Sequence, residues 1–145
     1  MKLEDILVMW EADSAIDDHH LDRSSVDTAK LHAKYLRLLI DAKLGMTKVN
    51  QDYNTLRQQK FRYYRGEMSR SELTELNWDQ WQYNKPLKNE MDEFLKGDKD
   101  LAAMQQKIEF RETIVYALEA ILSQIKQRDW QIRNAITWKT FIAGN

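Results

Sequence analysis

Cationic and aromatic side chains concentrate in one short stretch near the middle of the chain, LRQQKFRYYRG. The stretch holds four positive charges and two adjacent tyrosines: Arg57, Lys60, Arg62, Tyr63, Tyr64 and Arg65. No acidic residue occurs between Asp52 and Glu67, and Lys43 and Lys48 come before the stretch. Positive side chains neutralise phosphates and flat rings stack on bases, so this composition is typical of proteins that bind single-stranded nucleic acid.

The charges are segregated along the chain, although the formal net charge is only −1. Residues 1–29 hold two basic and eight acidic side chains, whereas residues 30–66 hold nine basic and two acidic ones. Residues 67–100 hold five basic and nine acidic side chains. Segregation of this kind bears on binding partners rather than on fold. The alternative is a solvated basic face with both tyrosines in the core, because basic helix faces are common.

Other residues that could do chemistry form no catalytic or metal-binding pattern. Asp17, Asp18, His19 and His20 are the only cluster of histidines and acids, and adjacent residues rarely point at one ion. The chain has no cysteine, its four glycines are scattered singly, and no serine lies in a nucleophile-elbow setting. We therefore expect no enzyme activity, no cofactor and no metal. A small metal enzyme dependent on His19 or His20 is a further alternative.

The composition predicts long helices, because only five residues are glycine or proline while 31% are charged. Such helices must therefore position the basic stretch. One helix is predicted from about Ser25 to Tyr64, with Gly45 as a weak point and Gly66 as its stop. Its apolar seam steps by three and four through Leu31, Tyr35, Leu38, Ala42, Met46, Val49, Tyr53 and Leu56. A second seam with such steps runs through Leu101, Met104, Ile108, Arg111, Val115, Leu118, Leu122 and Ile125.

These seams predict an all-α fold, an elongated protomer with two long antiparallel helices. We expect a single helical domain over residues 1–145. No apolar run reaches the roughly 18 residues that a membrane span needs, so no membrane partner is expected.

Shorter helices are predicted at residues 3–10, within 67–81 and at 87–95, the last closed by Gly97. Ser24 and Ser25 are the predicted N-cap of the first long helix. Trp78 and Trp81 are three residues apart and would share a helix face. We expect them to cover the core rather than to stack on bases, because the charge around them is acidic.

The C-terminal stretch, residues 129–145, is apolar around most of a helical circumference, unlike the DNA-binding body predicted for residues 1–128. Its large apolar side chains are Trp130, Ile132, Ile136, Trp138, Phe141 and Ile142. A helix of this kind cannot bury all of its apolar side chains against one neighbouring helix, so we expect it to assemble several copies of the chain. A terminal helix tucked into its own core is the alternative.

Several short motifs resemble the UvsY family of recombination mediators of T-even-type bacteriophages, over nearly the whole chain. They begin with MKLEDI, Ile16-Asp17 and the basic segment ending in Tyr63-Tyr64 before Gly66. They continue with Lys88, Glu90-Met91, Leu95, Asp98-Lys99-Asp100 and Leu101, and they end on Phe141, Ala143 and Gly144.

The resemblance implies a recombination mediator that binds single-stranded DNA and helps to load the phage recombinase onto DNA coated with single-strand-binding protein. It implies a ring of six or seven copies, held by the C-terminal helix, in the cytoplasm of the infected host. Lys60 falls at a basic position of the family's DNA-binding segment. The position two earlier, basic in the family, is Gln58 here, with Arg57 and Arg62 on either side. The competing interpretation is a helical coiled-coil scaffold that binds only proteins.

Overall fold

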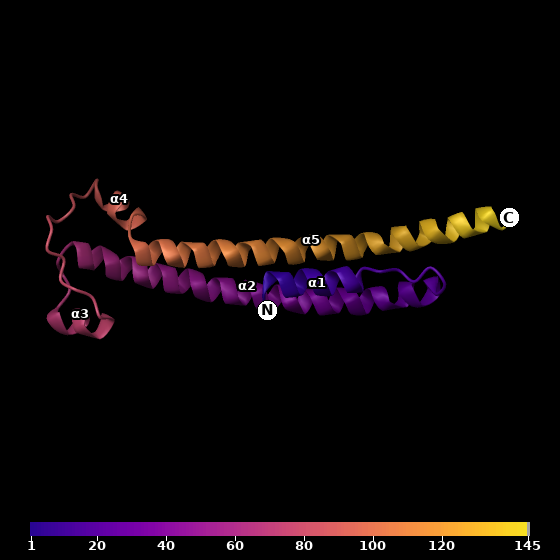
Figure 1. Cartoon of the computed structure of the whole chain (residues 1–145), viewed down its shortest axis with the longest axis horizontal. Helices are drawn as coiled ribbons and strands as arrows, with labels where there is room; N and C mark the ends of the chain where they lie inside the picture. Colours follow the sequence, from indigo (N-terminus) through magenta and orange to yellow (C-terminus); the bar gives the residue numbers. More distant parts are fainter. Residues whose placement is uncertain (145) are drawn as a thin grey trace. The chain divides into compact units, whose positions relative to one another are not determined.

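The computed structural model describes residues 1–144, and their regular elements are all helices (Figure 1). In chain order they are α1 (Leu3–Asp13), α2 (Leu21–Tyr64), α3 (Arg70–Leu76), α4 (Met91–Lys96) and α5 (Lys99–Ile142). The predicted all-α fold class is confirmed. Within the described part of the chain, no helix has the length and apolar character that crossing a membrane requires.

The chain groups into two compact units, residues 1–44 with 111–145 and residues 45–110. The two long helices contribute to both units, because α2 and α5 each continue across a unit boundary. One of these boundaries falls at Gly45, but α2 remains helical there.

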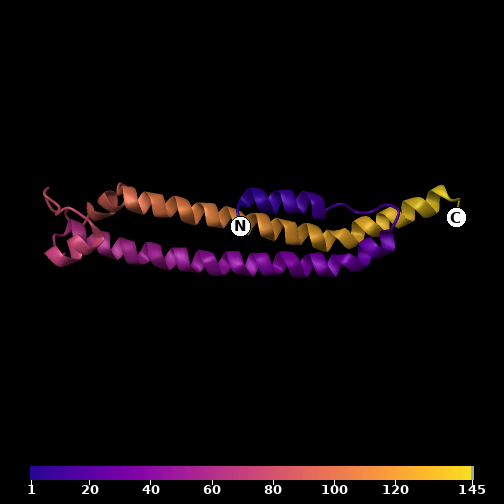
Figure 2. The ribbon, with the colours of Figure 1, turned by 60° about the horizontal axis from the view of Figure 1, so that its bottom comes forward.

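The first unit is built from α1, the first half of α2 and most of α5, and Figure 2 shows α1 alongside the long helices. Tyr35 is fully buried there, and the Trp10 ring packs edge-on against the Tyr35 ring, with 5.4 Å between the ring centres. The buried Arg128 guanidinium donates hydrogen bonds to the carbonyl oxygens of Ser14 and Ala15. These carbonyls follow the C-terminal end of α1, where the helix dipole favours a cation.

The two long helices run antiparallel within this unit, as the seams predicted. Lys139 near the end of α5 pairs with Asp18 just before α2, with 3.6 Å between the charged atoms. Further along α2, Lys43 pairs with Glu119, nearer the start of α5, at 3.4 Å.

The second unit joins the last turns of α2 to α3, α4 and the first turns of α5. Its buried core is small and consists of Tyr64, Met91, Leu95 and Leu101. Half-buried aromatic side chains surround this core, namely Tyr53, Phe61, Tyr63, Trp81 and Phe94. Aromatic rings therefore supply much of the apolar contact that holds this unit together.

Both predicted seams face the interior. All eight residues of the α2 seam are buried or half-buried, as are seven of the eight on α5. The exception is Arg111, the polar position of its seam, which is exposed.

Some predicted helix boundaries were wrong for local reasons. Helix α2 begins at Leu21 rather than near Ser25, and Ser24 is a buried residue inside it whose hydroxyl accepts from the backbone N–H of Asp17. Helix α3 ends at Leu76 because Asn77 adopts a left-handed conformation (φ 58°), so Trp78 and Trp81 do not share a helix face. Helix α4 begins only at Met91.

The predicted assembly segment is not a separate helix, since α5 continues without interruption to Ile142. The last residue of that segment, Asn145, lies outside the described residues.

Candidate nucleic-acid interface

The basic segment, residues 57–65, occupies the last turns of α2 and the residue that follows them. Gly66 stops the helix in a left-handed conformation (φ 70°) that suits glycine. Its N–H donates to the carbonyl of Tyr63, and the N–H of Glu67 donates to the carbonyl of Arg62. This pair of hydrogen bonds is a Schellman motif, which satisfies the last carbonyls of the helix. The sequence thus fixes where the basic segment ends.

Each of the four cations in the basic segment has a carboxylate partner. Arg57 pairs with Asp92 at 3.6 Å, Arg62 with Glu72 at 3.0 Å, Arg65 with Glu67 at 3.0 Å, and Lys60 with Asp98 and Asp100 at 3.2 and 2.8 Å. All five acids lie in residues 67–100, the acidic segment that follows the basic one. The positive charge that looks uncompensated in the sequence is therefore partly compensated by tertiary contacts.

The three arginines remain near the surface despite these pairs. Their side chains are 45–52% exposed. An exposed ion pair contributes at most about 1 kcal/mol, because water and salt screen it. Arg57, Arg62 and Arg65 can therefore exchange a carboxylate for another anion at little cost.

Lys60 occupies a different environment, since its side chain is only 8% exposed. Its ammonium group lies between two carboxylates and 4.2 Å from the centre of the Trp78 ring. Asp98, one of those carboxylates, also accepts from the Tyr64 hydroxyl at 2.6 Å. It caps the start of α5 as well, accepting from the backbone N–H groups of Asp100 and Leu101 at 2.9 and 3.0 Å.

This buried network shifts two pKa values. Burial by itself raises the pKa of Asp98, but the hydrogen bonds from Tyr64 and Leu101 and the pairing with Lys60 outweigh it, so the pKa lies below its ordinary value. Burial and the hydrogen bond to Asp98 raise the pKa of Tyr64. Asp98 is therefore ionised and Tyr64 neutral at pH 7.

The two tyrosines lie in a cluster of edge-to-face rings. Tyr63 contacts Trp78 at 5.4 Å between ring centres, and Tyr64 contacts Trp81 at 4.8 Å and Phe94 at 5.8 Å. Tyr64 is buried, whereas Tyr63 is half-buried and donates its hydroxyl hydrogen to the carbonyl of Asp79. The rings of Trp78 and Trp81 pack on this cluster and are half-buried themselves, as expected of side chains that cover a core.

The structure brings six of the eight predicted DNA-contact residues together on the end of α2. Lys48 is exposed on the same helix and in the same unit, while Lys43 belongs to the other unit. Their assignment as DNA contacts stays a prediction. Sequence reasoning left Asp98 out of the site, although an aspartate directly before a predicted helix is a recognisable N-cap signal. No cluster of three or more metal-ligating side chains occurs in residues 1–144.

The six predicted assembly residues lie on the last turns of α5. Ile132 is buried in its own unit, whereas Trp130, Ile136, Trp138, Phe141 and Ile142 are exposed. Trp138 and Phe141 stack at 5.6 Å between ring centres. Their assembly role also stays a prediction.

Residues 9–145 match the family described as recombination, repair and ssDNA binding protein UvsY. The chain belongs to the UvsY family. A curated member, the recombination protein uvsY of Enterobacteria phage T4, is 24% identical over 144 residues, which cover 99% of both chains.

Crystal structures of the bacteriophage T4 recombination mediator protein UvsY share the fold. One, in lattice type II, matches with a TM-score of 0.82 at 22% identity over 99% of this chain and 98% of that one. Another, in lattice type IV, gives 0.84 at 20% identity over 97% and 99%. The resemblance seen in the short motifs of the sequence is thereby confirmed.

Proposed function

We propose that this UvsY-family chain binds single-stranded DNA through the basic segment at the end of α2. The observation that carries the proposal is the set of three half-exposed arginines, Arg57, Arg62 and Arg65, on a helix end braced by aromatic rings. Their ion pairs are weak enough for phosphates to replace the carboxylates. The family description, which names recombination, repair and ssDNA binding, supports the same function.

Three other residues of the basic segment are buried or half-buried and support the exposed arginines: Lys60, Tyr63 and Tyr64. The Lys60 ammonium is held between Asp98 and Asp100, so its main effect is to fix the end of α2 against the start of α5. The Tyr64 hydroxyl donates a hydrogen bond to the carboxylate of Asp98 as well. A fixed surface binds better than a mobile one, because less conformational entropy is lost on binding. Tyr63, half-buried, has part of its ring available for contact.

The proposed cellular role is that of a recombination mediator in the cytoplasm of the infected host. One protomer offers few phosphate contacts, but a ring of six or seven copies would multiply them through multivalency. The exposed apolar end of α5 supports such assembly. A strand organised by the ring would be held less tightly by the phage single-strand-binding protein and presented to the phage recombinase. Neither step needs bond-making chemistry.

Salt-dependent binding tests the proposal. A labelled oligothymidine is titrated at several salt concentrations with the parent and with an Arg57→Gln, Arg62→Gln variant. Each phosphate contact contributes roughly 0.7 to the slope of log affinity against log salt, so the variant should bind more weakly and with a shallower slope. An Arg37→Gln, Lys126→Gln variant is the control, because it removes the same charge from exposed positions in the other unit.

Equal losses in both variants would indicate a general charge effect and would overturn the assignment of the site. A parent that binds no oligothymidine in dilute buffer, yet captures a helical protein, would favour the scaffold interpretation instead.

A further inference from the structure

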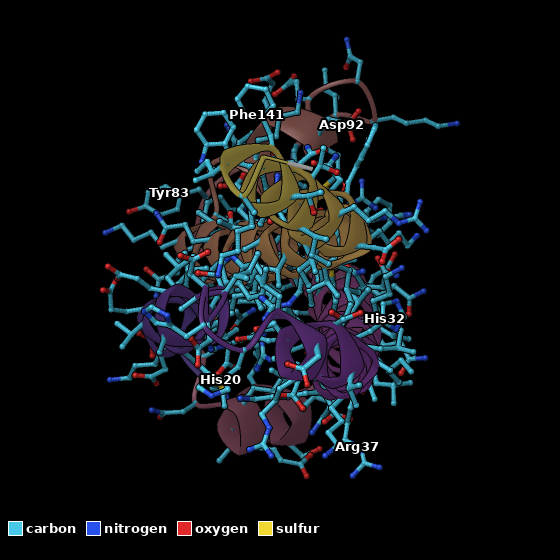
Figure 3. The ribbon with its side chains drawn as sticks, turned by 90° about the vertical axis from the view of Figure 1, so that its right-hand side faces the viewer. His20, His32, Arg37, Tyr83, Asp92 and Phe141 are labelled. Carbon is cyan, nitrogen blue, oxygen red and sulfur yellow. The ribbon has the colours of Figure 1, made fainter. Side chains whose placement is uncertain are left out.

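Tyr83 is a highly exposed aromatic side chain, with 76% of its surface accessible. It lies in the non-helical stretch between α3 and α4, and Figure 3 shows it at the periphery of the side chains. Its ring centre is 4.9 Å from that of Trp81, with a tilt of 59° between the planes. One part of the ring thus rests on Trp81, and the rest is open.

Trp81 gives this tyrosine a firm support. Its ring packs edge-on against Tyr64, a member of the buried core, at 4.8 Å and against Phe94, which packs on that core, at 6.0 Å between ring centres. Its indole N–H donates to the carbonyl of Asn84 at 3.2 Å, a bond that closes the backbone around Tyr83. Tyr83 is therefore presented by a braced turn, which lowers the entropic cost of using it for binding.

Positive charge lies beside this turn. Lys85, two residues after Tyr83, lies over Gly66, with its Cε 3.1 Å from where a Cβ of residue 66 would be. That position directly follows Arg65, and the acid next to it in the chain, Glu67, is paired with Arg65 at 3.0 Å. An exposed ring next to cations suits a ligand with flat faces and phosphates.

We propose that Tyr83, braced by Trp81, stacks on an unpaired base of single-stranded DNA while Lys85 meets an adjacent phosphate. This inference rests on the proposed function and extends the site from the end of α2 to the turn at residues 81–85. The subsite recognises a base by its flat face, so it accepts any base rather than reading sequence.

The test separates stacking from charge by using two strands of equal length, an oligothymidine and an abasic sugar–phosphate chain. Tyr83→Leu removes the ring but keeps an apolar side chain, and Tyr83→Trp keeps a ring. Tyr116→Leu is the matched control, because Tyr116 is similarly exposed at 73% but lies on α5 in the other unit. Affinities are measured by fluorescence anisotropy, and particle mass by sedimentation.

Tyr83→Leu should bind oligothymidine at least on the order of fivefold more weakly, since stacking on one aromatic ring has that effect or more. Its affinity for the abasic strand should be that of the parent. Tyr83→Trp and Tyr116→Leu should both keep the parent's preference for oligothymidine.

Three results would overturn the inference alone: unchanged binding by Tyr83→Leu, an equal loss on both strands, or a change in particle mass that makes Tyr83 an assembly contact. A parent that binds neither strand would overturn the proposed function, and this inference with it.

Discussion

The ammonium nitrogen of Lys60 lies 3.2 Å from a carboxylate oxygen of Asp98, and both side chains are almost completely buried. This contact joins the end of α2 to the residue that caps α5. A buried ion pair is costly to break, because it leaves an uncompensated charge away from water. A buried ion pair with Asp98 thus fixes the basic segment, residues 57–65, in place.

Asp98→Asn should weaken DNA binding, although it removes a negative charge from beside a phosphate-binding surface. The substitution breaks the pairing with Lys60 and weakens the hydrogen bond from Tyr64, so we expect the free energy of unfolding to fall by about 2 kcal/mol. Denaturant unfolding and anisotropy titrations measure the two effects.

Asp92→Asn is the matched control, because Asp92 pairs with Arg57 and its side chain is exposed. Figure 3 shows Asp92 at the periphery of the side chains. It should change the unfolding free energy by no more than about 0.5 kcal/mol and leave DNA affinity equal or higher. If Asp98→Asn also tightened DNA binding, the organising role of Lys60 and Asp98 would be wrong.

Acid should destabilise the protein through Asp98. The pKa of Asp98 in the folded chain lies below the ordinary value of an aspartate, so the folded state favours the ionised form. The stabilisation that the ionised form provides is fully present above the pKa of about 3.9 that an aspartate has in an unfolded chain. It is lost as the pH falls through the lower pKa that Asp98 has in the folded chain. The difference in unfolding free energy between the parent and Asp98→Asn should therefore narrow below about pH 4. A difference that stays constant between pH 7 and pH 3 would contradict the assigned shift.

Trp138→Glu should yield smaller particles by sedimentation velocity. Trp138 is exposed within its own chain and stacks with Phe141, so a charge there would be buried only in an assembly. The helical circular dichroism of the variant should match that of the parent. Thr137→Glu adds the same charge at the neighbouring exposed position and should leave the mass unchanged if the apolar side chains make the contact. An unchanged mass for Trp138→Glu would remove this segment from assembly.

Gly66→Ala should lower the free energy of unfolding by about 1 kcal/mol, because residue 66 has a positive φ that costs an L side chain roughly that much. The new methyl group would also meet the Lys85 side chain, which is flexible at that end and can move. Gly66→Asn tolerates the left-handed conformation better and should lose less stability. Equal losses in thermal or denaturant unfolding would show that crowding, rather than backbone conformation, sets the cost.

The sequence by itself determined the long helices, the end of α2 and the position of the basic segment. These features depend on residues close together in the chain: the apolar steps of three and four, and the glycine at position 66. The motifs spread along the chain also identified the family correctly.

Tertiary structure decided which of the marked side chains are accessible. Lys60 and Arg62 look alike in the sequence, but only Lys60 faces Asp98, Asp100 and Trp78. Ile132 likewise turned inward while Trp130 and Trp138 stayed exposed. A helical pattern gives the direction of a side chain around its own axis, but its burial depends on which residues from other parts of the chain pack against that face.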